Sequence, residues 1–141
     1  SYDNFKFTVE GQWKVNPNWE FTDTIAVAWS DEFTLYQDYA YINGYSTDTS
    51  RAKVNAEKGV AYDVDLQLGK KEESILLIAK VYKNNSTGTA NVVGEYGHVE
   101  LAARDISVSF SGGSGGAEIG MSVGIVDNLN MAVPDYEDFT Y

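Results

Sequence analysis

Apolar side chains recur at every second position over long stretches of this chain. Phe5, Phe7 and Val9 alternate with polar residues, and the same rhythm runs from Val60 to Leu68. A period of two is that of a β-strand, because successive side chains leave opposite faces of the pleated backbone. No stretch has a convincing helical period. The pattern therefore predicts an all-β protein in which one face of each sheet is buried.

Turn signals separate the alternating stretches and indicate the number of strands. Asn43-Gly44 is a strong turn dipeptide, and residues 84–89 form a polar loop. The most apolar stretch, Ile75 to Lys83, is expected to be a central strand, whereas residues 33–42 have apolar side chains on both faces. We count about nine or ten strands, typical of a sandwich or barrel. We expect a single-domain antiparallel β-sandwich over residues 1–141, immunoglobulin-like or jelly-roll-like.

Composition and charge exclude several classes of protein. The chain has 141 residues, no cysteine and a net charge of −11. This length buries a core without disulfides, and the lack of thiols excludes a thiolate zinc site or a cysteine nucleophile. The acidic balance argues against nucleic acid or an anionic membrane as a partner, and no apolar run approaches the roughly 20 residues of a membrane helix. The chain starts Ser1-Tyr2 without methionine, so we expect a mature secreted, extracellular or cell-surface protein.

Two patterns are compatible with catalysis, and neither is convincing. Residues 112–116 match the G-x-S-x-G nucleophile elbow, which requires a following helix and a later histidine. Here a strand-like stretch follows, and the one histidine, His98, precedes the serine. Asp63 and Asp65 share a strand face about 7 Å apart, where paired carboxylates can hydrolyse glycosidic bonds, but this spacing is usual for a solvated face. We therefore expect no enzymatic activity.

The sequence also contains candidate sites for an attached glycan and for a bound metal ion. Asn84 and Asn85 each begin an N-x-[ST] pattern in a polar loop, so we predict an N-linked glycan there. Acidic residues at 31–32, 72–73 and 135–138 supply the oxygen ligands that calcium prefers. A structural calcium ion and simple solubilising charge remain open alternatives for them, and we predict no other cofactor.

The first apolar stretch decides the functional interpretation. Such a segment either closes its own sheet or adds to an open sheet edge of a neighbouring subunit, where it satisfies unpaired backbone groups. When every subunit donates to the next, the contact is head-to-tail and a filament grows. We therefore expect an extracellular structural protein, a homopolymer assembled by donor-strand exchange of residues 1–11. The expected interface residues are Phe5, Phe7 and Val9 as plugs and Tyr136, Phe139 and Tyr141 as a second docking element.

Aromatic side chains leave a second function open. The chain has ten tyrosines and three tryptophans, and amphipathic rings of this kind gather at recognition surfaces. Tyr36 shares a strand face with Asp38, and Tyr45 falls in a predicted loop, so both are surface candidates. Trp29 shares its phase with aliphatic neighbours, which favours the core. The alternative is a secreted carbohydrate-binding, lectin-like module that uses Tyr36, Tyr45 and a tryptophan.

Overall fold

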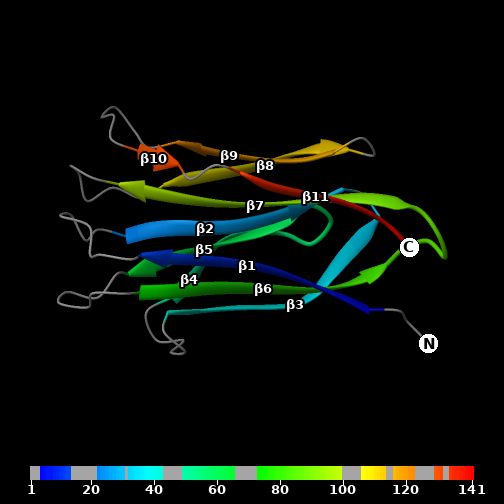
Figure 1. The fold of residues 1–141 in the computed structure, drawn as a ribbon, viewed down its shortest axis with the longest axis horizontal. Helices are drawn as coiled ribbons and strands as arrows, with labels where there is room; N and C mark the ends of the chain where they lie inside the picture. Colours follow the sequence, from blue (N-terminus) through cyan, green and yellow to red (C-terminus); the bar gives the residue numbers. More distant parts are fainter. Residues whose placement is uncertain are drawn as a thin grey trace.

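Three antiparallel groups of strands make up the computed structural model (Figure 1). The structure describes residues 4–13, 22–30, 32–42, 49–65, 73–99, 106–113, 116–122, 129–131 and 134–141. These ranges contain eleven strands, against the nine or ten expected. Within them, no helix is long and apolar enough to cross a membrane. The predicted all-β, antiparallel sandwich is confirmed, with a two-stranded ribbon as an additional layer.

The first sheet, sheet A, has three strands in the order β1-β6-β3. These are β1 (Asn4–Trp13), β6 (Glu73–Lys83) and β3 (Phe33–Ile42). β6 is central, as its strongly apolar sequence predicted. β1 pairs with β6 along its whole length and has no other strand beside it among the described residues. One edge of β1 therefore carries backbone groups that are available for pairing.

A bulge in β3 explains why apolar side chains occur on both of its faces. The register with β6 shifts between Leu35 and Gln37, so Tyr36 is the extra residue of a β-bulge. One extra residue turns every later side chain to the opposite face. Phe33 before the bulge and Ile42 after it are therefore both buried, although their positions differ in phase. The pattern had suggested a central strand or an aromatic surface; β3 is an edge strand of sheet A.

The second sheet, sheet B, is wider than sheet A. Its strands are β2 (Thr22–Trp29), β4 (Thr49–Asn55), β5 (Gly59–Asp65), β7 (Thr89–Val99), β10 (Leu129–Met131) and β11 (Asp135–Thr140). The order is β7-β2-β5-β4, and β10 and β11 pair one after the other with the outer side of β7. β4 thus forms one edge of sheet B, while β10 and β11 form the other.

The main core lies between the two sheets. Ile25, Val27 and Trp29 of β2 belong to one buried cluster with Leu77 and Val81 of β6. Each is at most 2 % exposed. Removing such a side chain from water contributes about 1.5–3 kcal/mol, so this alternating set provides much of the driving force for the fold.

A ribbon covers the other face of sheet B. It consists of β8 (Ser107–Gly113) and β9 (Gly116–Ser122), and Figure 1 shows it running along β7. Ala26 and Ala61 of sheet B cluster with Val108 of the ribbon. Small side chains on this face allow the ribbon to approach closely. In the hairpin, Gly112 has φ of 104°, and a Cβ there would lie 1.8 Å from the Gly116 carbonyl oxygen, so only glycine fits.

Candidate functional site

Four of the six residues expected at a subunit interface meet in one aromatic cluster inside the chain. Phe5 of β1 has its ring centroid 5.8 Å from Phe139 and 5.9 Å from Tyr141, both from the C-terminal segment. Phe7 lies 5.9 Å from Phe139. Phe33 of β3 is the hub, with ring centroids 5.3 Å from Phe7 and Tyr141. We call these five residues the aromatic cluster; it joins the first and last strands of the chain.

The other two expected interface residues lie apart from the aromatic cluster. Val9 packs over Gly94 of β7, where an added Cβ would lie only 2.7 Å from Val9 Cγ2. Glycine at this position therefore allows β1 to approach sheet B. Tyr136 of β11 is 54 % exposed and is the most accessible of the six.

Within the single chain, β1 closes its own sheet. Its residues pair in register with β6, for example Phe7 with Ala79. The side chains that hold it come from other strands: Trp29 of β2 lies 6.0 Å from Phe7, beside the contacts to Phe33 and Phe139 described above. The seat of β1, which we call the β1 socket, is thus built by β2, β3, β6, β7 and β11.

The sandwich is open on the side where β1 faces β7 and β11. A groove of about 230 Å³ lies there, lined by the apolar residues Val9 and Gly94 and by the acidic residues Glu10, Asp135 and Glu137. Among the described residues, sheet A is narrower than sheet B, and Val92 and Tyr96 on the inner face of β7 are only half-buried. This open side brings the free edge of β1 close to the acidic inner face of β11.

The opposite side of the sandwich is closed by hydrogen bonds. The Leu35 amide of β3 donates to the Ala56 carbonyl after β4, at 2.8 Å. Asp38 of β3 accepts bonds from Arg51 of β4 and from the Tyr62 hydroxyl of β5. Burial and the bond to Asp38 raise the pKa of Tyr62 to about 12. Among the described residues, these contacts tie the two sheets together on the side opposite the groove.

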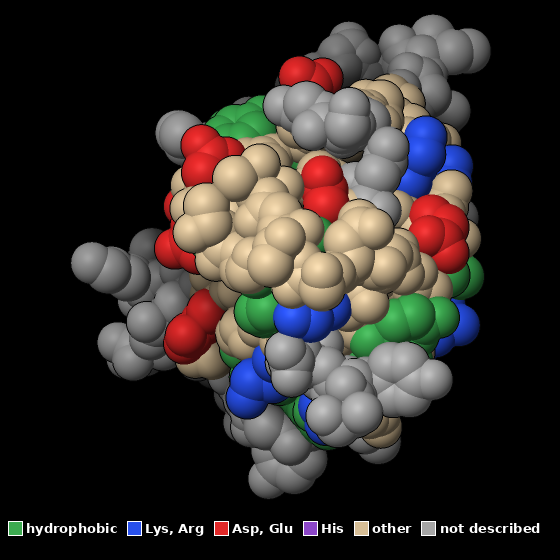
Figure 2. Space-filling view, turned by 90° about the vertical axis from the view of Figure 1, so that its right-hand side faces the viewer, with side chains coloured by type: hydrophobic (Ala, Val, Ile, Leu, Met, Phe, Trp, Pro, Cys, Tyr) green, Lys and Arg blue, Asp and Glu red, His purple; other side chains and the backbone are tan. Residues whose placement is uncertain are grey.

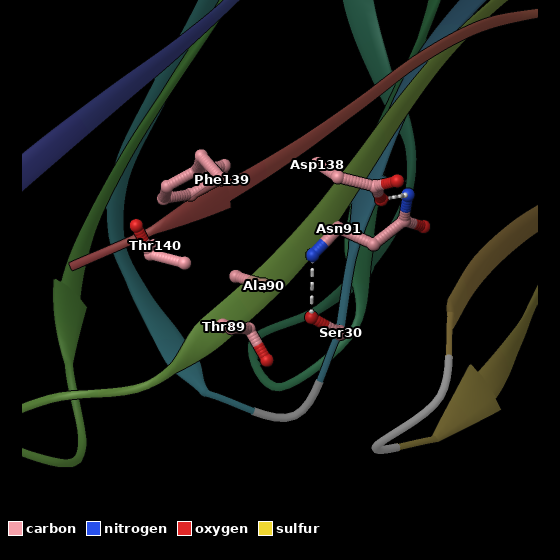
Figure 3. Close-up of a pocket in the computed structure, with 7 residues that line it drawn as sticks. All are labelled: Ser30, Thr89, Ala90, Asn91, Asp138, Phe139 and Thr140. Carbon is pink, nitrogen blue, oxygen red and sulfur yellow. Dashed lines mark hydrogen bonds between the residues drawn. The ribbon is translucent and has the colours of Figure 1, made fainter.

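A polar hollow of about 400 Å³ lies where β7 and β11 meet the end of β2 (Figure 3). Its central residue is Asn91, whose side-chain amide donates to Asp138 at 2.7 Å and whose backbone amide donates to the Ser30 hydroxyl at 3.0 Å. The Asn91 side-chain oxygen accepts from the Ala117 amide of β9 at 2.7 Å. Asn91 therefore joins β7, β9 and β11, and we assign this hollow a structural role.

A buried polar network was missed by the sequence analysis. The Tyr96 hydroxyl donates to Asp23 Oδ2 at 2.5 Å, and His98 Nδ1 lies 2.8 Å from Asp23 Oδ1. Asp23 is 0 % and His98 4 % exposed. The available signal was Asp23 itself, a charged residue in phase with Ile25 and Val27 on the core face. Because Asp23 and His98 are buried, we assign this network to the stability of β2 and β7.

The two patterns weighed for catalysis are not supported by their surroundings. The segment after the G-x-S-x-G match, Gly116–Ser122, is strand β9, whereas a nucleophile elbow requires a helix. Ser114 lies outside the described residues. Asp63 accepts a hydrogen bond from Thr24 at 3.1 Å, and Asp65 is exposed. Each aspartate has the surroundings of an ordinary sheet residue.

The expected glycan acceptors lie in the exposed loop between β6 and β7. Asn84 and Asn85 are both exposed. The Asn84 side-chain oxygen accepts from the Thr34 hydroxyl at 2.9 Å, which holds it against β3. Figure 2 looks onto this end of the molecule, where uncharged polar side chains and backbone form the middle of the surface. Glycosylation of Asn84 or Asn85 remains a prediction.

A structural calcium ion and simple solubilising charge stay alternatives for the acidic residues. Among the described residues, no three histidine or acidic side chains come together as a metal site. Asp31 and Glu72 lie outside the described part of the chain. Asp135, Glu137 and Asp138 are exposed along β11, where successive side chains point to opposite faces.

Tyrosines gather on the outer face of sheet A. Tyr36 is 48 % exposed and stacks on Tyr82 with ring centroids 6.3 Å apart. Tyr39 and Tyr41 form an edge-to-face pair at 5.4 Å, and the Lys80 ammonium lies 5.6 Å from the Tyr39 ring. We call this group the tyrosine face; it contains Tyr36, one of the residues expected to bind carbohydrate.

The expected carbohydrate site also includes a tryptophan. Trp29 is 2 % exposed and belongs to the core, as its phase predicted. The Trp13 side chain, Trp19 and Tyr45 lie outside the described residues.

Glu95 is a buried acid whose ionisation should set part of the pH dependence of stability. It is 3 % exposed, and burial raises its pKa. The folded chain therefore keeps this proton at a pH where the unfolded chain has lost it, so stability falls as pH rises from the ordinary glutamate pKa through the raised one. We expect Glu95→Gln to raise the melting temperature at neutral pH and to flatten this slope.

Thermal unfolding followed from about pH 4 to 8 checks this expectation. Glutamine keeps the oxygen that accepts from the Tyr96 amide at 3.1 Å. Glu118→Gln, on the exposed side of β9, is the matched control and should change little. A lower melting temperature for Glu95→Gln at pH 7 would contradict the argument.

The chain matches no known family model, no curated protein and no solved structure. Its function has to be argued from its own residues.

Proposed function

We propose that this protein is the subunit of an extracellular filament in which copies exchange β1. The observation that carries the proposal is how β1 is held: among the described residues it pairs with β6 alone, and its apolar side chains pack against residues of later strands. Phe5 and Phe7 contact aromatic rings of β3 and β11, and Val9 packs over Gly94 of β7. β1 of a second copy therefore fits the same socket with the same contacts.

The position of β1 in its sheet favours exchange. β1 pairs with β6 alone, so its transfer breaks and remakes one ladder. Contacts inside the socket are equal in the closed and exchanged forms. The equilibrium between the closed monomer and the exchanged filament then depends on two terms. Association costs translational freedom, and new contacts between copies offset that cost. When each copy gives its strand to the next copy and receives one from the copy before it, the arrangement is head-to-tail and grows into a filament.

The extracellular assignment is supported by the loop between β6 and β7. Asn84-Asn85-Ser86-Thr87 holds both N-x-[ST] patterns, and Asn85, Ser86 and Thr87 are exposed. Attachment of an N-linked glycan requires such an accessible loop in an exported protein. A net charge of −11 keeps subunits soluble before assembly.

Engineered cysteines distinguish exchanged from closed chains. Lys6 and Lys80 lie directly opposite each other in the β1–β6 pair, and the chain has no cysteine of its own. Opposite residues in antiparallel strands have Cα atoms about 4.5–5.5 Å apart, which a disulfide spans. In the variant with Lys6→Cys and Lys80→Cys, exchange places the disulfide between copies. We expect oxidised filaments to give a ladder of covalent oligomers on a non-reducing gel.

Lys6→Cys alone is the matched control, because one thiol per chain links at most two chains. Electron microscopy of the same samples shows whether filaments are present. The proposal fails if the assembled double variant yields only internally closed monomers, or if the wild-type protein stays monomeric at high concentration.

Carbohydrate binding is a second candidate, favoured by the tyrosine face. Tyr36 and Tyr39 present rings at the surface of sheet A, and Lys80 adds a hydrogen-bond donor beside them. A glycan array compares the wild type with Tyr36→Ala and Tyr39→Ala. Tyr136→Ala, at an exposed tyrosine on β11, is the control. Binding lost in the first two variants and kept in the third would favour this function, and absence of any bound glycan would exclude it.

A further inference from the structure

The two edges of sheet B carry opposite charge. β4 presents Arg51 and Lys53 and contains no acidic residue, although the net charge of the chain is −11. At the other edge, β11 presents Asp135 and Glu137, both exposed. Arg51 is engaged by Asp38 of its own chain, so Lys53 is the cation that β4 offers to a partner.

Exposed apolar side chains occur on the same two edges. Val54 of β4 is 42 % exposed, Met131 of β10 is 42 % exposed and Tyr136 of β11 is 54 % exposed. The other large apolar residue that is exposed in the described part of the chain is Tyr36, at the bulge of β3. Single exposed apolar residues are ordinary, and three of these four lie on the two edges of sheet B.

Both edges also have backbone groups without a neighbouring strand. Among the described residues, β4 pairs only with β5, and β11 pairs only with β7. Charged side chains commonly guard such edges against aggregation. Here the charges at the two edges have opposite sign. Two positively charged β4 edges repel each other, as do two negatively charged β11 edges, whereas β4 attracts β11. This arrangement selects one contact between copies and excludes the others.

We infer that β4 of one copy adds antiparallel to β11 of a second copy, with Lys53 opposite Glu137 and Val54 opposite Tyr136. Both pairs fit one antiparallel register, because residue numbers increase along one strand while they decrease along the other. Lys53 and Glu137 then share one face of the joined sheet, and Val54 and Tyr136 share the other. Opposite charges and an aromatic–β-branched pair are both favourable cross-strand neighbours.

This contact makes sheet B continuous from copy to copy. β4 and β11 are different surfaces on opposite edges of the sheet, so the contact is heterologous and does not close into a dimer. It goes beyond the exchange of β1 and does not require it. If β1 is exchanged as well, this contact adds favourable interactions between copies and so favours the filament over the closed monomer.

Charge reversal tests the inference. We expect Lys53→Glu and Glu137→Lys each to weaken self-association about tenfold or more, because an attractive pair becomes repulsive. An equimolar mixture should associate again, since each variant then offers the edge that the other lacks. The double variant in one chain should also recover. Sedimentation velocity and light scattering at low and high salt provide the measurement, and wild-type association should weaken with salt.

The control is Glu118→Lys, which makes the same charge change on the exposed side of β9 and should associate like the wild type. Repeating the series in the oxidised Lys6→Cys, Lys80→Cys monomer keeps β1 in its own sheet, so edge pairing is measured without exchange. If the double cysteine variant gives a ladder of covalent oligomers but charge reversal does not change association, the result supports exchange of β1 and contradicts pairing of β4 with β11. Failure of the mixture to recover, or a locked wild-type background that does not associate, would overturn the inference.

Discussion

Replacement of Phe33 by alanine is expected to lower the free energy of unfolding by about 3–5 kcal/mol, the usual cost of removing a large buried aromatic side chain. Phe33 is 0 % exposed and lies 5.4 Å from Phe5 and 5.7 Å from Phe139, in addition to its two closer neighbours. Alanine at this position leaves a cavity lined by rings from both ends of the chain. Chemical denaturation followed by circular dichroism measures the loss.

The effect of Phe33→Ala should extend to β1. Phe33 forms the floor against which Phe5 and Phe7 pack, so its loss weakens the β1 socket more than the rest of the sandwich. Hydrogen exchange at the amides of β1 should accelerate more than at β2. Phe33→Leu, which keeps most of the volume, is the matched variant and should cost less. A loss below about 1 kcal/mol for the alanine variant would show that the aromatic cluster is not packed as described.

Strand identity followed from local pattern, whereas strand pairing did not. The alternation of Phe5, Phe7 and Val9 correctly predicted β1, and the apolar run of β6 correctly predicted a central strand. Paired residues of β1 and β6 are 60 to 78 positions apart in the sequence, for example Phe7 opposite Ala79. Such pairings depend on how all the strands pack together, and no spacing along the sequence encodes them.

The sequence of β2 contained an ambiguous signal for the ribbon that covers sheet B. β2 has an unbroken apolar run, with Ile25 and Val27 facing sheet A and Ala26 and Ala28 facing the ribbon. A strand buried on both faces loses its alternation. The small alanines also indicate that another layer approaches closely, but they do not identify which segment supplies it.

The candidate site was predicted as separate residues and not as a cluster. Phe5, Phe7, Phe139 and Tyr141 were selected for their apolar character near the two ends of the chain. That they meet around Phe33 follows from β1 lying in sheet A and β11 in sheet B on the same side of the sandwich. This convergence means that exchange of β1 also removes and restores contacts of the last strand.

Asp23→Ala is expected to destabilise the fold by about 3–5 kcal/mol, because it removes the shared acceptor of a buried hydrogen-bond network. Asp23 accepts from the Tyr96 hydroxyl and contacts His98 Nδ1, and these two residues then lose that acceptor inside the core. Asp23→Asn keeps the shape and one acceptor oxygen, so its cost should be smaller. Tyr96→Phe removes one hydrogen bond and should cost about 1–3 kcal/mol.

A double-mutant cycle between Asp23→Asn and Tyr96→Phe separates the network from simple loss of packing. Residues that share a hydrogen bond give a coupling energy of about 0.5–3 kcal/mol, whereas independent residues add. The chain has one histidine, so its ring signals in an NMR spectrum report this site alone. We expect those signals to shift in Asp23→Asn and to keep their positions in Glu118→Gln. Additive energies together with unshifted histidine signals would contradict this expectation. They would mean that Asp23 does not hold β2 and β7 together. The network would then contribute nothing to the rigidity of sheet B.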